Sequence, residues 1–283
     1  MAALTCRAVP RESGGRQPLV DIVLEPSAKC DQDSLSFDPR ATVAPPVSDG
    51  LSDRRGGGRG LGFSPRTLIF LEGAEAESIF QIVDGAVMLY KLLPDGRRQV
   101  VELLGPGDLF GFSPLPVRDC SAETLLATHC VALDRGLVER SPSLMRQVSA
   151  RLYSQLCALH EHVMLLGRKS AMERMTSFLM RCVPGRGQHG CPGPRDGQDH
   201  ADIRLAMTRQ EIADYLGLTI ETVSRSLTKL KRRGVVSIGR LDEIYIDDVC
   251  RLCRLTGTHL TRGRWCSSRM AGTAQSTGRI ASP

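Results

Sequence analysis

The stretch TRQEIADYLGLTIETVSRSLTKLKRRG, residues 208–234, decides the fold of the C-terminal part of this chain. Thr208 followed by Glu211 is a capping-box pattern, which predicts that a helix begins there. Gly217 can end that helix, because glycine tolerates the left-handed backbone of a helix C-terminus. Thr219 can then cap a second helix of about four turns. Two helices joined by a short glycine-containing turn predict a helix-turn-helix motif.

The second of these helices has an apolar face and a polar face. Val223, Leu227 and Leu230 recur at steps of four and three residues, which predicts a buried stripe. On the polar face, Glu221 and Arg225 could form an ordinary ion pair worth about 0.2–0.5 kcal/mol. They could also bind bases, since a carboxylate accepts from cytosine N4 and a guanidinium donates to guanine O6 and N7 in the major groove.

We interpret the polar face as a DNA-binding surface. Residues in the first turns of such a helix contact bases, and basic residues at its C-terminal end suit phosphates. The segment SIGRLDEIYID that follows could add a β-hairpin wing. The predicted DNA-contacting residues are Thr208, Arg209, Gln210, Thr219, Glu221, Thr222, Ser224, Arg225, Thr228, Lys229, Lys231 and Arg232.

Length and composition limit the possible classes of protein. The chain has 283 residues, 41% hydrophobic and 4% aromatic, which is enough for two small domains with aliphatic cores. A net charge of +6 is compatible with a nucleic-acid partner but does not establish one. The opening MAALTCRAVPRE lacks the apolar region of a secretory signal, and no apolar run approaches the roughly 18 residues of a membrane span. We therefore expect a cytoplasmic protein without membrane contact, whose ten cysteines are mostly reduced.

The character of the chain changes near residue 62. Residues 1–62 are rich in Pro, Gly, Ser and charge, and we expect a disordered arm because such a segment buries too little apolar surface. Residues 63–136 contain short β-rich runs between Gly, Asp and Pro turns, which predicts a small β-roll or barrel. Within it, LPDGRRQ at residues 93–99 predicts a hairpin through its Asp-Gly turn. We also expect a disordered tail over residues 257–283.

Residues 137–168 change to a helical period. Four leucines and a valine recur at steps of four, three, four and three, which is the a/d seam of a coiled coil. A parallel copy of the same helix is the simplest partner for this seam, although a buried core helix could show the same pattern. We predict a dimerisation helix here and a winged helix-turn-helix domain over residues 169–256. The predicted dimerisation residues are Leu152, Leu156, Leu159, Val163 and Leu166.

Residues 208–234 resemble the DNA-binding signature of the Crp/Fnr regulators, and specifically of the FixK branch. GAVMLYKLLPDGRRQVVELLGPGDLFGF is similar to the β-roll of that family, and VMLLGRKSAMERMTSFL is similar to the end of its dimerisation helix and the next helix. The resemblance covers residues 66–256 and leaves both tails outside. It implies an α+β fold, with an N-terminal cyclic-nucleotide-binding-like β-roll, a long dimerisation helix and a C-terminal winged helix-turn-helix.

The resemblance also implies a DNA target. In the FixK branch, the Glu, Ser and Arg of E-x-x-S-R bind a TTGA-type half-site, and Glu221, Ser224 and Arg225 match them. Members that bind TGTGA carry an additional Arg just before the Glu, where this chain has Ile220. The implied target is double-stranded TTGAT-N4-ATCAA, bound by a homodimer of matching two-fold symmetry. The family further implies mainly an activator of nitrogen-fixation or microaerobic genes, which touches RNA polymerase through exposed roll loops such as residues 94–97.

A cyclic nucleotide is one hypothesis for the signal that such a regulator senses. The family would need its Gly-Glu and Arg-Ser pairs, which hold the ribose and the phosphate. This chain has Gly111-Phe112 and Cys120-Ser121 at the matching places. A phenyl ring cannot hold a ribose hydroxyl, and a thiol cannot replace a bidentate guanidinium on a phosphate. We therefore expect no cyclic-nucleotide cofactor.

An oxygen- or redox-responsive sensor, with a cofactor or a reactive cysteine, is the alternative function. An iron–sulfur sensor could use Cys130 as its fourth ligand, but Cys6 and Cys30 stand alone in the arm and four thiolates must converge on the cluster. Relatives with a redox-active cysteine beside the helix-turn-helix differ from this chain, which has Met207 and Thr208 there. We favour a regulator without a cofactor, governed by its own abundance as the FixK resemblance implies.

Two further groups of residues could bind a metal. Cys250 and Cys253 form a lone C-x2-C with His259 nearby, but a zinc site needs a fourth ligand, so packing within a helix is the favoured interpretation. The sequence HEH at residues 160–162 lies on the predicted dimerisation helix, where we expect a solvated face. No metal site is predicted.

Two other functional classes compete with a regulator. An enzyme is not favoured, because the chain has no G-x-S-x-G, Walker loop or H-E-x-x-H motif. A ligand-binding module that uses only the β-roll would leave the polar face and basic end of the second helix unexplained. Sequence-specific binding of duplex DNA distinguishes these classes.

Overall fold

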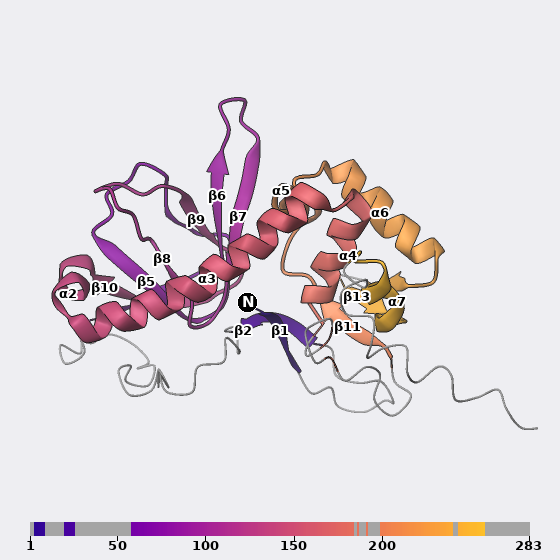
Figure 1. The fold of residues 1–283 in the computed structure, drawn as a ribbon, viewed down its shortest axis with the longest axis horizontal. Coiled ribbons are helices and arrows are strands. Elements are labelled where there is room, and N and C mark those ends of the chain that lie inside the picture. The colour runs from indigo at the N-terminus through magenta and orange to yellow at the C-terminus, as the bar shows by residue number, and fades with distance from the viewer. Residues whose placement is uncertain are drawn as a thin grey trace, which may run out of the picture.

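The computed structural model describes residues 58–183, 186, 191, 199–239 and 243–257, and the backbone of two further strands at residues 3–8 and 20–25. These residues form an N-terminal β-roll, a long helix and a C-terminal domain of helices with a small sheet (Figure 1). The predicted α+β architecture, with a β-roll, a long helix and a winged helix-turn-helix, is confirmed. No helix among the described residues combines the length and apolarity needed to cross a membrane.

The β-roll consists of two four-stranded sheets with antiparallel pairing. Three phenylalanine rings stack at its centre with centroids 5.1–6.0 Å apart. One sheet has the order β3-β10-β5-β8 and the other β4-β9-β6-β7. The strands are β3 (Gly58–Phe63), β4 (Leu68–Phe70), β5 (Ser78–Asp84), β6 (Val87–Leu92), β7 (Arg98–Leu104), β8 (Leu109–Phe110), β9 (Ser121–Thr124) and β10 (Thr128–Asp134).

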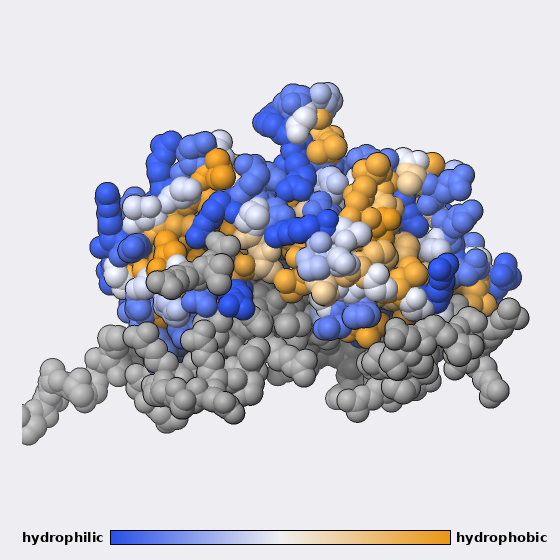
Figure 2. Space-filling model, turned by 180° about the vertical axis from the view of Figure 1, so that it is seen from behind, coloured by the Kyte–Doolittle hydropathy of each residue, from blue (hydrophilic) through white to orange (hydrophobic). Residues whose placement is uncertain are grey.

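Strands β6 and β7 form the hairpin that the Asp-Gly turn predicts. The Leu93 amide donates to the Arg97 carbonyl at 2.8 Å, and Gly96 supplies the positive φ of +84° that the turn requires. This hairpin projects beyond the rest of the roll (Figure 1). Seen from behind, the same end of the molecule carries a projecting lobe with hydrophobic residues among hydrophilic ones (Figure 2). Leu92 and Leu93 are both exposed there.

Helix α2 (Arg135–Arg140) and helix α3 (Pro142–Arg168) follow the roll. Ser141 separates them: it ends α2 and caps α3, where its hydroxyl accepts from the Leu144 amide. The predicted single segment 137–168 is therefore two helices. Helix α3 has 27 residues and runs from beneath the β-roll to the C-terminal domain (Figure 1).

The C-terminal domain packs four helices with three strands of a five-stranded sheet. Ser170 begins α4 through a capping box with Glu173. Strand β13 lies between β11 and β12, and the β12–β13 hairpin is the wing that the sequence predicts. The elements are α4 (Ala171–Arg181), β11 (Ala201–Arg204), α5 (Arg209–Leu216), α6 (Ile220–Arg232), β12 (Val236–Ile238), β13 (Glu243–Ile246) and α7 (Val249–Arg254).

The N-terminal segment differs from its prediction as an arm over residues 1–62. Strand β3 begins at Gly58, and strands β1 (Ala3–Ala8) and β2 (Val20–Glu25) pair with each other. Strand β2 extends the C-terminal sheet by pairing parallel to β11. The short β-branched run VDIVLE explains this difference, since the composition of the surrounding residues outweighed it in the prediction. The rest of the arm, and the tail beyond residue 257, lie outside the described residues.

The two domains share one apolar core. This core is one cluster of apolar side chains. It contains Met88 and Val100 of the roll, Leu165 of α3, and Ile212 and Leu216 of α5, each almost fully buried. Burial of apolar side chains on both sides stabilises the contact between domains. The C-terminal domain is therefore packed against the roll rather than joined to it by α3 alone.

Candidate nucleic-acid interface

The helix-turn-helix forms as its capping residues predict. The Thr208 amide donates to Glu211 Oε2 at 2.7 Å, and the Glu211 amide donates to Thr208 Oγ1 at 3.2 Å. Gly217 ends α5 in the left-handed conformation with a φ of +60°. Thr219 caps α6, with its hydroxyl accepting from the Thr222 amide. These local contacts fix where α6 starts relative to α5.

Helix α6 buries the predicted stripe, since Val223 and Leu230 have no exposed surface and Leu227 is 2% exposed. The opposite face is open to solvent over its whole length. Helix α6 lies on the side of the C-terminal domain away from the β-roll (Figure 1). Of the predicted DNA-contacting residues, Arg209 and Thr222 are half-buried, and the others are exposed: Thr208, Gln210, Thr219, Glu221, Ser224, Arg225, Thr228, Lys229, Lys231 and Arg232.

Glu221 and Arg225 do not form the ordinary ion pair that was the competing interpretation. Within the described part of the chain, no salt bridge joins either residue to another. The backbone amide of Glu221 and the Thr219 hydroxyl hold the pKa of the Glu221 carboxyl below its usual range, and Arg225 adds a weaker attraction. The helix thus presents an ionised carboxylate and a guanidinium side by side, both available to a partner.

Cationic residues surround the last turn of α6. Lys229, Lys231 and Arg232 are all exposed, and Arg233 ends the helix. Ser237 and Ile238 of the adjacent wing strand are also exposed. This arrangement can place positive charge along a phosphate backbone while the first turns of α6 enter a groove.

The predicted dimerisation residues divide between solvent and core. Leu152, Leu156 and Val163 are exposed, whereas Leu159 is half-buried. Leu166 differs from the others, because it packs against the protein's own core. The large apolar residues exposed on α3 are Met145, Leu152, Tyr153, Leu156, Val163 and Met164.

The expectation of a solvated face for residues 160–162 is wrong at His162. His160 is exposed, but the His162 ring is 6% exposed and stacks on Tyr215 of α5, with ring centroids 4.3 Å apart. Burial, with a smaller contribution from the nearby Arg181, lowers the pKa of His162 to about 4. Helical position alone did not reveal that α5 covers this side of α3.

Sequence reasoning also missed Arg174, which joins three helices. Its guanidinium donates to the Leu166 and Lys169 carbonyls at the end of α3, at 2.6 and 2.9 Å, and to the Leu216 carbonyl at the end of α5 at 3.0 Å. Carbonyls at helix C-termini lack intrahelical partners, so a cation there stabilises both ends. No local pattern in the sequence distinguishes this arginine from an exposed one.

Residues of the β-roll bear on the prediction that no cyclic nucleotide binds. Phe112 packs against an apolar cluster, and burial raises the pKa of the Cys120 thiol to about 12, which leaves it uncharged. The buried Arg118 guanidinium donates to the Gly111 carbonyl and lies 4.4 Å from the centre of the Phe70 ring. At the places where the family resemblance puts the ribose and phosphate contacts, the chain thus carries a phenyl ring and a neutral thiol.

Among the cysteines considered for cofactor sites, the structure describes the side chains of Cys130, Cys250 and Cys253. Cys130 is 1% exposed, as predicted for a small buried residue, and burial raises the pKa of its thiol to about 12. Cys250 and Cys253 lie on α7, and Arg186 donates to Cys250 Sγ at 3.2 Å. Among the described residues, no three His, Cys, Asp or Glu side chains gather as metal ligands would.

Two family models match this chain. A Crp-like helix-turn-helix domain matches residues 173–255, and a cyclic nucleotide-binding domain matches residues 61–140. The solved structure of FixK2 from Bradyrhizobium japonicum is 33% identical, with a TM-score of 0.58, and the match covers 70% of this chain and 96% of FixK2.

Curated relatives agree with these domains. The nitrogen fixation regulation protein FixK of Bradyrhizobium diazoefficiens is 36% identical over 189 residues, which cover 64% of this chain and 75% of FixK. The transcriptional activatory protein AadR of Rhodopseudomonas palustris is 34% identical over 185 residues, covering 62% of this chain and 72% of AadR. With these domain matches and relatives, this chain belongs to the Crp/Fnr family of DNA-binding transcription regulators.

Proposed function

We propose that this chain is a FixK-like regulator that binds TTGAT-N4-ATCAA palindromes as a homodimer and mainly activates nitrogen-fixation or microaerobic genes. The similarity to FixK and AadR supports the gene class and the activating role. The observation that carries the DNA target is the exposed face of α6, where Glu221, Ser224 and Arg225 lie without competing salt bridges.

The chemistry of this face matches a TTGA half-site. Arg225 can donate two hydrogen bonds to guanine O6 and N7, and Glu221 can accept from cytosine N4 of the opposite strand. Ser224 can serve a neighbouring base as donor or acceptor. Ile220, at the start of α6, has no donor for the additional guanine of a TGTGA site. Lys229, Lys231 and Arg232 would hold the flanking phosphates, and Thr208, Arg209 and Gln210 would approach the backbone from α5.

The exposed apolar stripe of α3 supports the homodimer. Leu152, Leu156 and Val163 lie on one side of the helix, and Tyr153 and Met164 widen that side. Pairing with a second α3 would remove this surface from water. The two TTGA cores of the palindrome are about one helical turn apart, which suits two recognition helices related by a two-fold axis.

The interior of the roll supports a regulator that needs no cyclic nucleotide. Phe112 and the neutral Cys120 replace the groups that would hold that ligand, so abundance of the protein would set its activity. Buried thiols with a raised pKa are also poor nucleophiles, which weighs against Cys120 and Cys130 as redox sensors. The exposed tip of the β6–β7 hairpin is our candidate for contact with RNA polymerase.

Fluorescence anisotropy of aerobically purified protein on labelled duplexes tests this proposal. Without cofactor or cyclic nucleotide, we expect the TTGAT-N4-ATCAA duplex to bind at least about tenfold more tightly than a TGTGA duplex at the same fixed salt concentration. A duplex with both half-sites scrambled controls for binding to phosphates. Equal affinity for all three duplexes would reject the assignment of α6 as the specificity determinant.

A further inference from the structure

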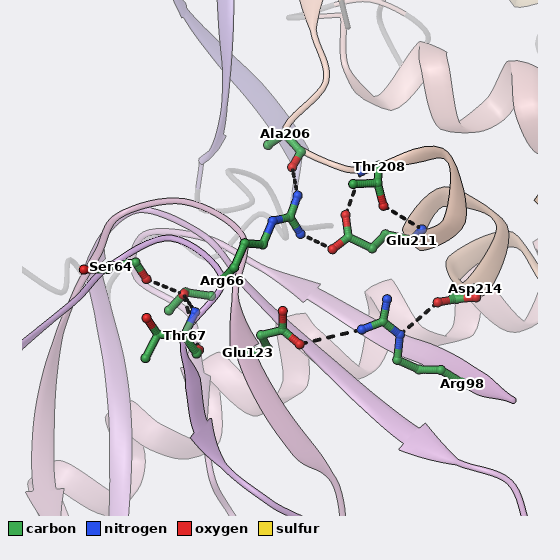
Figure 3. Close-up of polar contacts among 10 residues, drawn as sticks. Ser64, Arg66, Thr67, Arg98, Glu123, Ala206, Thr208, Glu211 and Asp214 are labelled. Carbon is green, nitrogen blue, oxygen red and sulfur yellow. Dashed lines mark hydrogen bonds and ion pairs between the residues drawn. The ribbon is translucent and has the colours of Figure 1, made fainter. Parts of the chain in front are cut away.

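Two arginines of the β-roll bind acidic residues of α5 (Figure 3). The Arg66 guanidinium pairs with Glu211 and donates from Nη2 to the Ala206 carbonyl at 2.8 Å. Arg98, at the start of β7, places its Nε 2.8 Å from Asp214 Oδ2. These two bridges connect the roll directly to the first helix of the helix-turn-helix.

The acidic partners are buried, so these bridges differ from ordinary surface ion pairs. The side chains of Glu211 and Asp214 are 7% and 8% exposed, and that of Arg98 is 23% exposed. Charges in such positions are screened little by salt, and removal of one partner leaves the other desolvated and uncompensated.

The backbone of Arg66 is held in an unusual conformation. Among the described residues, it is the only residue other than glycine with a positive φ, which is +60°. Side chains make this region unfavourable, and residues remain in it where the surrounding structure imposes it. The Arg66 amide donates to the Thr124 carbonyl at 2.9 Å, which fixes the turn that aims its guanidinium at α5.

The carboxylates of Glu211 and Asp214 each accept a second hydrogen bond from a residue of the C-terminal domain. Glu211 uses Oε2 to accept from the Thr208 amide in the capping box and Oε1 to bind Arg66. Asp214 accepts from Gln210 Nε2 at 2.7 Å through Oδ1 and binds Arg98 through Oδ2. The arginines therefore bind groups that are rigidly attached to α5.

Helix α5 also contacts the long helix on its other side. Tyr215 stacks on His162 of α3, and Arg174 joins the ends of α3 and α5. The roll and α3 together thus determine how α5 is oriented, and the short turn at Gly217 transmits that orientation to α6. In a dimer joined along α3, the distance between the two α6 helices would depend on it.

We propose that Arg66 and Arg98 are positioning residues that set the spacing between half-sites that the dimer accepts. This inference rests on the proposed function. Each α6 keeps its own base contacts when a bridge is lost, but the second half-site then meets a recognition helix of less defined position. The effective concentration of this helix at the second half-site then falls. A palindrome of the correct spacing therefore binds less tightly, and the difference in affinity between it and palindromes of other spacings becomes smaller.

Anisotropy titrations on palindromes with N3, N4 and N5 spacers, and on a single half-site, test the proposal. For Arg98→Ala and Arg66→Ala we expect affinity for the N4 palindrome to fall about tenfold. The ratio of affinity for the N4 palindrome to affinity for the N3 or N5 palindrome should fall to about threefold. Affinity for the single half-site should stay within about twofold of the unaltered chain. Arg97→Ala is the matched control, because Arg97 is adjacent, equally charged, and paired with Asp95 of its own hairpin.

Hydrogen–deuterium exchange provides a readout that does not depend on the operator. Exchange in peptides spanning residues 205–216 should accelerate in Arg66→Ala and Arg98→Ala and not in Arg97→Ala. If an alanine variant does not fold, Arg98→Lys replaces it, since a lysine keeps the charge but cannot reproduce the guanidinium geometry. We expect its exchange and spacer preference to lie between those of the unaltered chain and Arg98→Ala.

Three results would separate the hypotheses. Unchanged spacer preference and unchanged exchange in the arginine variants would overturn the positioning role. Tighter binding to N4 would also overturn it, because the bridges would then hold a binding-incompetent orientation. Failure of the unaltered chain to prefer any TTGAT palindrome would reject the proposed operator, and the exchange data would then decide whether the arginines fix α5.

Discussion

Helices α5 and α6 are separated by only three residues, but they differ in burial: most of α5 is buried, whereas one face of α6 is exposed. Residues 211–216 of α5 are all buried, and its two acidic side chains are paired with arginines of the roll. Helix α6 buries an apolar stripe and exposes Glu221 and Arg225, which form no salt bridge with any other residue that the structure describes. The two acidic side chains of α5 therefore serve contacts within the protein, whereas the polar face of α6 is exposed.

Truncation of Leu216 should have the largest effect, since this α5 residue has no exposed surface and lies in the shared core. Leu216→Ala should lower the free energy of unfolding by about 2–5 kcal/mol, measured by urea denaturation. Ile220→Ala, at an exposed position of α6, is the control and should change it by no more than about 0.5 kcal/mol. Similar losses in the two variants would contradict the contrast between the helices.

Because His162 is buried between α3 and α5, we expect the contact between these two helices to weaken in acid. Burial lowers the pKa of this histidine from 6.5 to about 4, so between these values the unfolded chain binds a proton that the folded chain does not. Its contribution to the free energy of unfolding should therefore fall by up to about 3 kcal/mol as the pH drops through this window. In His162→Phe, which keeps a ring against Tyr215, that contribution should be absent.

The pH effect is measured as the difference in unfolding free energy between the two chains, by urea denaturation from about pH 7 to about pH 4.5. The difference is needed because burial raises the pKa of Glu102 to about 7 and that of Asp108 to about 6. Those two carboxyls favour the folded state as the pH falls, with the opposite sign, in both chains. A difference that does not vary with pH would show that His162 titrates normally.

On α6, Arg225→Ala should act on recognition and leave folding unchanged. We expect a loss of about 1–3 kcal/mol in binding to the TTGAT palindrome and a relaxed preference for guanine at one position of each half-site. Anisotropy on duplexes substituted at that position measures both effects. Since Arg225 is exposed, its urea denaturation curve should match that of the unaltered chain. An equal loss on every duplex would instead assign Arg225 to a phosphate.

Lys231→Ala should have the smallest effect and no sequence preference. Because Lys231 is exposed near the end of α6, we expect binding to all duplexes to weaken alike. The slope of log affinity against log salt concentration should decrease by about one unit. A loss confined to the TTGAT duplex would contradict the assignment to the phosphate backbone.

The sequence predicted the features that local chemistry determines. The capping box at Thr208, the turn at Gly217 and the buried stripe of α6 depend on residues within one or two turns of each other. The pairing of Arg66 with Glu211 joins residues 145 positions apart, and the burial of His162 requires α5 to cover α3. Neither leaves a periodic signal, because a bridging arginine and a solvated arginine look the same in a sequence.

Strands β1 and β2 illustrate a different limit. Their residues are short β-prone runs inside a segment whose composition suggested disorder, and pairing with β11 depends on a sheet formed by residues far along the chain. Leu166 is similar, since its heptad position predicts a seam but the adjacent C-terminal domain covers it. Periodicity indicates that a residue is buried, and not which surface buries it.

The length of α3 has a mechanical consequence. A helix of 27 residues is about 40 Å long, so a tilt of about 5° at the roll moves its far end by about 3.5 Å. That displacement is close to the rise of about 3.4 Å between successive base pairs. Because α3 is this long, a small change in its tilt displaces its far end by about one base-pair step. The stiffness of the contact between α3 and the roll therefore limits how precisely the two chains of a dimer can select the spacing between half-sites.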